Sequence, residues 1–323
     1  MASVRTKKGK LGWLLRLGVS AVVLVVIFRL VPPAQIVAAA RQLSPATWLL
    51  SLALFLFGHL VAAFKWRLLV GDEIPVGAAL RAHLAGLSAN IALPGVAGGD
   101  VVRAALVAPL VRSRAQLAVG SLMDRVIDTV GLLCIALAGS WLVLADRSSG
   151  VRIFLLVAIL AAVIGGVAGL FAARPLERWV LRTLPNRKIG TVAARLLGAL
   201  GEFAARPWRL LSCLLLSLAV QCLFVTINIW LADDIGLHLP AASWFAAWSL
   251  AKIIAIAPIS FGGLGVREAS MAALLQPFGA PPQQVVAVGL VWQTILYASG
   301  FIGFLVQALV SASRRGAPVK ASL

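Results

Sequence analysis

The sequence predicts an all-α integral membrane protein with about six transmembrane helices and two oppositely oriented re-entrant helical hairpins. Hydrophobic residues fill 61% of the 323 positions and charged residues only 12%, whereas a soluble domain carries about a quarter charged residues. Apolar runs of about 20 residues recur, which is the length that crosses about 30 Å of hydrocarbon. Because a backbone in hydrocarbon must satisfy its own hydrogen bonds, these runs are expected to be helices.

The first predicted helix follows a basic N-terminus. Met1–Lys10 is basic and leads into the apolar run Leu11–Val31. A cleaved signal peptide is the alternative, because Ala38-Ala39-Ala40 has the small residues of a cleavage site. The apolar run is longer than the core of a signal peptide, however, and further apolar runs follow it. We therefore predict an uncleaved first helix.

Two kinds of apolar segment make up the chain, which we treat as a single transmembrane domain over residues 1–323. The unbroken runs long enough to span are Leu11–Val31, Pro45–Val70, Ala115–Ala145, Val151–Ala173, Leu210–Ala232 and Gln283–Ser311. Val76–Val111 is broken at Pro94–Gly99, and Ala241–Gly279 is broken at Pro258–Gly265. Proline ends a helix and paired glycines admit non-helical backbone, so each broken segment is predicted to be helix, turn and helix.

The distribution of charge indicates that the broken segments enter the membrane and return. With both segments re-entrant and the N-terminus cytoplasmic, Lys65, Arg67 and the basic stretch Arg174–Arg209 lie inside. The loops Asp146–Gly150 and Asp233–Leu239 then lie outside, as the positive-inside rule requires. Counting only the first broken segment as a crossing would place Arg174–Arg209 outside. The prediction is a multi-pass protein of the cell (inner) membrane with both termini cytoplasmic.

Residues 174–209 are predicted to form a basic cytoplasmic loop. Within it, apolar and basic residues of Ile189–Ala205 alternate at helical spacing, which is typical of an amphipathic helix on the membrane surface. The net charge of +18 could also suggest a nucleic-acid partner. The basic residues cluster at the ends of apolar runs and in this loop, however, so we expect contact with anionic lipid and no nucleic-acid binding.

The two broken segments have the same pattern, which predicts an internal repeat of residues 76–145 and 241–311. The pattern P-x-x-x-G-G-x-x-V-R-x-A begins at Pro94 and again at Pro258, a constant offset of 164 residues. Three predicted crossings separate the two hairpins, and an odd number makes them enter from opposite faces. Their tips should meet near the midplane of the membrane, where many secondary transporters place their substrate sites.

The residues after each turn favour binding of an anion. The start of a helix carries unpaired N–H groups and partial positive charge, and glycine lets a phosphate approach the backbone. Arg103 and Arg267 lie within about one turn of these starts, and a guanidinium binds phosphate bidentately. The candidate substrate-binding residues at the two turns are Gly98, Gly99, Asp100, Arg103, Gly262, Gly263, Gly265, Arg267 and Glu268.

The third span adds Asp124, Arg125 and Asp128 to this candidate site. Asp124 lies about 14 Å along a helix that starts at Ala115, close to the bilayer centre. Ionisable groups there cost at least about 2.5 kcal/mol each and usually have a function. Substrate contact is one interpretation, and an ion-pair network that only holds the fold is the other. Arg125 and Asp128 have the three-residue spacing of such a pair, and so do Asp100 and Arg103.

Two further residues are weaker candidates. Lys252 could act as a gate or extend its side chain to the interface, and His59 could carry protons or only pack within its span. The three cysteines lie in apolar runs and the three histidines are scattered, so we expect no metal site. No nucleotide-binding motif is present in the sequence, and we expect no cofactor.

Together the spaced motifs carry a family resemblance. They are Asn90-x-x-x-Pro94 with Gly98-Gly99-Asp100 and Arg103, Asp124-Arg125-x-x-Asp128, and Pro258-x-x-x-Gly262-Gly263-x-Gly265-Val266-Arg267-Glu268. With these motifs the chain resembles, over nearly its whole length, the flippase-like family named after the transmembrane region of lysylphosphatidylglycerol synthetase. The sequence departs from the family pattern at Asp124, where the acidic residue is more often glutamate.

The resemblance implies translocation of a lipid. Fused family members move aminoacylated phosphatidylglycerol, and lipid-linked sugars or hopanoid-related lipids are suggested for stand-alone members. The expected partner is thus a phospholipid or a polyprenyl- or hopanoid-type lipid with an anionic headgroup. The fused members carry a soluble aminoacyltransferase domain that this sequence lacks, so we expect a transporter and no enzyme. The alternatives are an integral-membrane lipid-modifying transferase, with Asp100, Asp124 or Asp128 as base, and a non-transporting partner in envelope synthesis.

Overall fold

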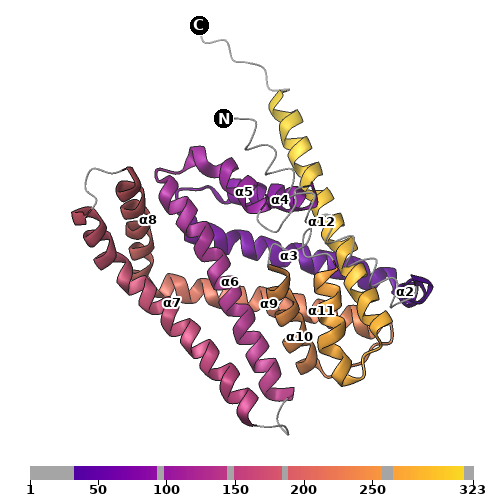
Figure 1. Ribbon diagram of the computed structural model, residues 1–323. Coiled ribbons are helices and arrows are strands. Elements are labelled where there is room, and N and C mark those ends of the chain that lie inside the picture. The colour runs from indigo at the N-terminus through magenta and orange to yellow at the C-terminus, as the bar shows by residue number, and fades with distance from the viewer. Residues whose placement is uncertain (1–32, 93–97, 144–148, 184–187, 257–264, 316–323) are drawn as a thin grey trace, which may run out of the picture.

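The computed structural model describes residues 33–92, 98–143, 149–183, 188–256 and 265–315. Within these ranges every regular element is helical (Figure 1). The helices are α2 (Pro33–Ala40), α3 (Pro45–Val70), α4 (Val76–Ala92), α5 (Gly98–Val107), η1 (Ala108–Leu110), α6 (Arg114–Val143), α7 (Ser149–Thr183), α8 (Lys188–Ala204), α9 (Pro207–Asp234), α10 (Ala241–Ile256), α11 (Val266–Leu275), η2 (Gln276–Phe278) and α12 (Pro282–Arg315). The predicted all-α class is confirmed for the described part of the chain.

Four of the described helices are long and apolar enough to cross a membrane. They are Pro45–Val70, Arg114–Val143, Pro207–Asp234 and Pro282–Ala312. Each coincides with one of the six predicted spans to within a few residues. The predicted span 151–173 lies inside α7, and the span 11–31 lies outside the described residues. The chain is therefore a multi-pass membrane protein.

Local sequence signals set the ends of α3. The hydroxyl of Ser44 accepts a hydrogen bond of 3.3 Å from the backbone N–H of Thr47, and Pro45 occupies the first helical position. Both are typical of a helix start. At the other end Gly71 has a φ of 141°, and its N–H donates to the carbonyl of Arg67. A glycine takes this backbone conformation without steric cost, so α3 ends there.

The chain contains two runs of helices with the same order. In the first, α4 has 17 residues, α5 has 10, η1 has 3 and α6 has 30. In the second, α10 has 16, α11 has 10, η2 has 3 and α12 has 34. The shorter helices pack beside each other, α4 with α5 and α10 with α11. Residues 93–97 and 257–264, which hold most of both predicted turns, lie outside the described residues.

In each run the first helix packs against the last helix of the other run. Helix α4 lies against α12, and α10 lies against α6. Glycine permits both contacts: a Cβ on Gly303 of α12 would clash with the carbonyl oxygen of Leu84, and a Cβ on Gly139 of α6 would lie 2.5 Å from the N atom of Ala246. Small residues at such crossings let membrane helices approach closely.

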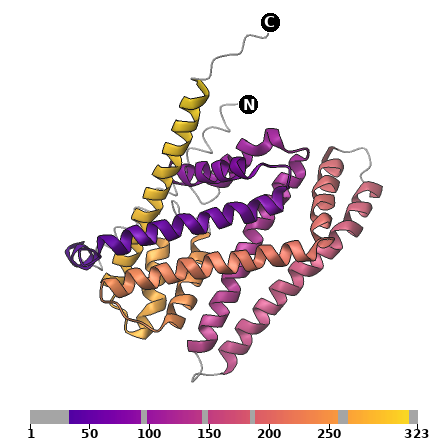
Figure 2. The same cartoon turned by 180° about the vertical axis from the view of Figure 1, so that it is seen from behind.

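The remaining helices flank this arrangement. Helices α3 and α9 run side by side in both views (Figures 1 and 2). Helix α8, which covers most of the predicted Ile189–Ala205 segment, pairs with α7. Ala199 and Phe203 of α8 are buried in a cluster with Met123 and Ile127 of α6. One side of α8 therefore packs on protein.

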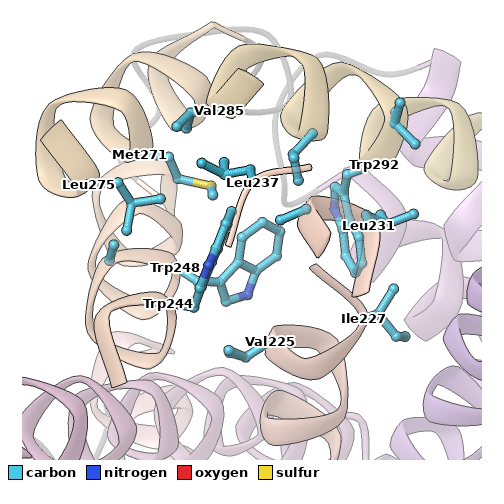
Figure 3. Close-up of a cluster of buried hydrophobic side chains, with 14 of the residues drawn as sticks. Val225, Ile227, Leu231, Leu237, Trp244, Trp248, Met271, Leu275, Val285 and Trp292 are labelled. Atoms are coloured by element: carbon cyan, nitrogen blue, oxygen red, sulfur yellow. The ribbon is translucent and has the colours of Figure 1, made fainter. Parts of the chain in front are cut away.

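The largest buried apolar cluster joins α3, α9, α10, α11 and α12 (Figure 3). Trp244 and Trp248 of α10 are 0% and 1% exposed, and the ring of Trp248 meets that of Trp292 at 4.9 Å and 77°. Helices in a membrane are held by such close packing, because lipid removes most of the hydrophobic driving force between them. The cluster fixes α10, α11 and α12 beside α9.

Candidate functional site

A cavity of about 280 Å³ lies at the centre of the bundle. Eight helices supply its walls: α3, α4, α5, α6, α9, α10, α11 and α12. Its charged lining residues are Lys65, Asp100, Arg103, Asp124, Arg125, Asp128, Lys252 and Arg267. The structure thus gathers residues of both broken segments and of the third predicted span around one space.

Arg103 of α5 is the centre of the first ion-pair group. Its side chain is 6% exposed, and Nη2 lies 3.0 Å from Asp124 Oδ2 and 3.1 Å from Asp100 Oδ1. The predicted pairing of Asp100 with Arg103 is confirmed. The guanidinium also lies 4.4 Å from the centroid of the Trp66 ring. Helices α3, α5 and α6 therefore meet at this one buried side chain.

Lys65 of α3 belongs to the same group. It is 1% exposed, its Nζ lies 3.0 Å from Asp124 Oδ1, and it also pairs with Asp128. The hydroxyl of Ser217 donates to Asp128 at 2.5 Å. The sequence analysis placed Lys65 with the basic flank of a span. The structure instead buries it between α3 and α6, because two carboxylates of α6 face it.

Arg125 has a different environment from the other two cations. Its side chain is 41% exposed, and Nη2 pairs with Asp100 Oδ2 at 2.5 Å. Asp100 is 23% exposed, so this pair borders the open part of the cavity. Because Asp100 contacts both Arg103 and Arg125, it joins the buried group to the accessible one.

Arg267 and Glu268 form a separate group at the start of α11. Arg267 pairs with the adjacent Glu268, and its Nη2 lies 3.3 Å from Gln293 Oε1. The second oxygen of Glu268 accepts a 2.7 Å hydrogen bond from the N–H of Gly265, which has a φ of 82°. A glutamate three residues after the cap satisfies an otherwise unpaired N–H of the helix start. Gly265 and Glu268 together begin α11.

The glycines at the start of α5 have a packing role. A Cβ on Gly99 would clash with the carbonyl oxygen of Gly86 and would lie 2.5 Å from Asn90 Oδ1. The N–H of Gly99 donates to that same oxygen at 2.9 Å. Gly98 is the first residue of α5, and Gly262 and Gly263 lie outside the described residues. The N–H groups of Gly99 and Gly265 are thus taken by side chains of the protein.

Aromatic side chains form one wall of the cavity. The ring centroids of Phe55 and Phe224 are 5.0 Å apart, and Trp292 packs edge-on against both. Lys252 lies at this wall, where its Nζ donates to Gln221 Oε1 at 2.8 Å and is 5.3 Å from the Phe224 centroid. These contacts place its ammonium against α9 in the lining of the cavity. Its predicted role as a gate stays a prediction.

His59 and His83 continue the network from Arg103. Arg103 Nη1 is 3.3 Å from His83 Nδ1, and His83 Nε2 is 3.0 Å from His59 Nδ1. A guanidinium only donates, so His83 Nδ1 accepts and its proton is on Nε2, which donates to His59. Both rings are therefore neutral in this arrangement. A proton role for His59 stays a prediction.

Two ionisable lining residues were missed from the sequence, Lys65 and His83. Lys65 stands five residues before the end of its span, where a basic residue is ordinary. Its one signal is a spacing: Phe55, His59, Ala62 and Lys65 follow one another at four, three and three residues, which is the spacing of one helix face, and all four line the cavity. His83 offered no signal, because nothing in α4 alone indicates that it faces Arg103.

Comparison with known proteins adds one finding. The family model described as "Lysylphosphatidylglycerol synthase TM region" matches residues 13–303 of the chain. No curated protein matches. The matched residues include every described side chain that lines the cavity.

Proposed function

The chain belongs to the family of the lysylphosphatidylglycerol synthase transmembrane region, and from this premise we propose that it is a lipid translocase of the flippase or scramblase type. It moves a lipid with an anionic or phosphate-linked headgroup across the cell membrane. The headgroup binds in the cavity, while the acyl or prenyl tails stay in the surrounding lipid.

The observation that carries this proposal is a cluster of ion pairs inside an apolar bundle. Lys65, Arg103 and Asp124 are each at most 5% exposed, and Lys65 and Asp124 lie on helices apolar enough to span a membrane. Charges at that depth are costly and are usually kept for a substrate or ion path. A volume of about 280 Å³ suits a polar headgroup and is too small for a whole lipid. These features support headgroup binding.

We further propose that α4–α5 and α10–α11 are re-entrant hairpins related by an inverted repeat. At about 1.5 Å per residue, α4 is about 25 Å long and α10 about 24 Å, which falls short of a hydrocarbon core of about 30 Å. Two observations support the repeat: the helices of both runs follow in the same order, and α4 packs on α12 as α10 packs on α6. Residues of α4, α5, α10 and α11 line one cavity, which supports two hairpins that approach each other.

We propose transport in place of catalysis because of how the carboxylates are held. Asp100, Asp124 and Asp128 each pair with at least one basic side chain. A general base needs a proton to abstract within hydrogen-bond reach, and these oxygens are directed at cations. A lipid-modifying transferase would also need a second substrate site. The charge cluster therefore favours binding and release over bond cleavage.

Reconstitution tests the proposal directly. Liposomes that contain the purified protein should move a fluorescent short-chain phosphatidylglycerol between leaflets faster than protein-free liposomes. Arg125→Gln should lower this rate at least about tenfold, while unfolding stays within about 1 kcal/mol of the parent, because a pair this exposed contributes little to folding. Arg112→Gln is the control, since its side chain is 96% exposed and outside the cavity. Equal rates for all three proteins contradict the proposal.

Cysteine labelling tests the orientation, with both termini and α8 proposed to lie in the cytoplasm. The side chains of Arg112 and His238 are 96% and 75% exposed. After Cys134, Cys213 and Cys222 are replaced by alanine, a membrane-impermeant maleimide added to intact cells should label His238→Cys and spare Arg112→Cys. In permeabilised cells the maleimide should label both variants. Labelling of Arg112→Cys in intact cells overturns the orientation.

A further inference from the structure

We infer that Lys252 Nζ binds the phosphate of the transported lipid, and that the cavity selects a headgroup with a single net negative charge over its aminoacylated form. This inference rests on the proposed function, because it assigns the lipid class to the same cavity. Five basic residues line the cavity. Among the described residues, Lys252 is the only one of the five without a carboxylate partner.

The other four basic residues are neutralised within the protein. Lys65 pairs with Asp128 and shares Asp124 with Arg103, Arg125 pairs with Asp100, and Arg267 pairs with Glu268, which makes four carboxylates for four cations. Each of these cations therefore has its charge balanced before a ligand arrives. A headgroup phosphate that separated Asp124 or Glu268 from its basic partners would leave a buried carboxylate unpaired, because these residues are 4% and 1% exposed, and this costs several kcal/mol.

Lys252 is held by neutral groups instead. Its ammonium donates to the amide oxygen of Gln221 at 2.8 Å and lies 5.3 Å from the centroid of the Phe224 ring. An ammonium has three N–H donors, and the described side chains accept one of them. Residues 257–264, which follow α10 outside the described ranges, contain no Asp or Glu. Of the chain's 11 acidic residues, only Asp146 is outside the described ranges.

The charge balance of the cavity gives the class of ligand. Five basic side chains face the three lining carboxylates and Glu268, so one positive charge is left over. His59 and His83 are neutral in their hydrogen-bonded chain. A phosphodiester headgroup such as phosphoglycerol carries one negative charge and cancels this excess. A lysyl ester adds amines that cancel or exceed the phosphate charge, and these amines would face Lys252 in a site of low dielectric.

Lys252 also has the right neighbours to hold a phosphate. It lines the same cavity as Arg103 and Asp124, lies beside the ring of Phe224, and has Trp248 on the same helix. Gln221 can turn its amide so that N–H groups face a phosphate oxygen once Lys252 moves toward the ligand. The headgroup would thus sit between Lys252 and the accessible Arg125–Asp100 pair.

Equilibrium binding to the full-length protein in detergent tests this inference without depending on transport. The probes are phosphatidylglycerol, lysyl-phosphatidylglycerol and diacylglycerol with identical acyl chains. The parent protein should bind phosphatidylglycerol at least about tenfold more tightly than either other lipid, since one lost charge contact of about 1.4 kcal/mol is a factor of ten. Lys252→Gln should remove that preference, Lys252→Arg should keep it, and Arg112→Gln should leave it unchanged.

Each outcome decides the matter. If the parent protein binds lysyl-phosphatidylglycerol as tightly as phosphatidylglycerol, or if Lys252→Gln keeps the preference, the inference is wrong, whatever the liposome assay shows. The comparison of lipids on the parent protein needs no variant, so a folding defect in Lys252→Gln cannot obscure it. If the preference holds but liposomes show no lipid movement, the proposed translocation fails while the charge selection stands.

Discussion

Arg103→Ala is expected to destabilise the protein by about 3–5 kcal/mol and to abolish lipid movement in liposomes. Arg103 is 5% exposed and pairs with both Asp100 and Asp124. Removing one partner of a buried ion pair leaves uncompensated charge, which accounts for an effect of about this size. The lost guanidinium also vacates its place over the Trp66 ring. Thermal unfolding in detergent and transport at a temperature where the variant is folded measure the two effects separately.

A double variant tests whether unbalanced charge is the cause of this destabilisation. Arg103→Ala leaves one excess negative charge in the group, and adding Asp124→Asn removes it while Lys65 still pairs with Asp128. The double variant should therefore be more stable than the single one by about 0.5–3 kcal/mol. Arg112→Ala, whose side chain is 96% exposed, should unfold like the parent. If Arg103→Ala unfolds like the parent too, the ion pairs around it do not hold the fold. If the double variant is less stable than Arg103→Ala, unbalanced charge is not the cause.

The spans could be predicted because length and composition alone define them. For Pro45–Val70 the predicted and observed ends agree, since Ser44 and Pro45 start the helix and Gly71 ends it. The helices within the broken segments were also predictable, because proline and paired glycines interrupt otherwise apolar runs. How α4 packs on α12 could not be read from the sequence, since Gly303 and Leu84 are far apart in the chain.

The charged residues of the site were predictable, but most of their partners were not. Asp124 and Arg103 stand out because an ionisable residue is costly in an apolar run. Lys65 does not, because only the packing of α3 on α6 brings it to Asp124. Arg267 and Glu268 are adjacent, and neighbouring helix positions normally point apart. They pair here because Glu268 turns back to the N–H of Gly265 at the helix start.

These pairings change how the cavity is understood. The sequence favours a strongly positive site in which helix starts and arginines together receive a phosphate. In the structure, the described arginines of the cavity have carboxylate partners, and the N–H groups of Gly99 and Gly265 have side-chain acceptors. What is left is a modest excess of one positive charge. A site of that kind can release its ligand, which a translocase must do on the far side of the membrane.

Gly303→Val is expected to lower stability by about 1–3 kcal/mol or more and to slow lipid movement at least about tenfold. A Cβ at this position of α12 would clash with the carbonyl oxygen of Leu84 and lie 2.6 Å from Ser88 Oγ on α4. A backbone oxygen cannot rotate out of the way as a flexible side chain can, so α4 must move away from α12. Overpacking of this kind costs about 1–3 kcal/mol. The shift would also break the 2.8 Å hydrogen bond from Ser88 Oγ to the carbonyl of Gly300.

The effect on transport follows from what α4 carries. His83, Gly86 and Asn90 of α4 line the cavity, and Asn90 holds the N–H of Gly99 at the start of α5. A displaced α4 therefore alters the position of Arg103 without touching its side chain. Gly169→Val on α7 is the matched control, because nothing lies within 4 Å of a Cβ at that position. Gly303→Val with parent-like unfolding and transport would show that α4 and α12 need not approach closely, and that the cavity does not depend on their contact.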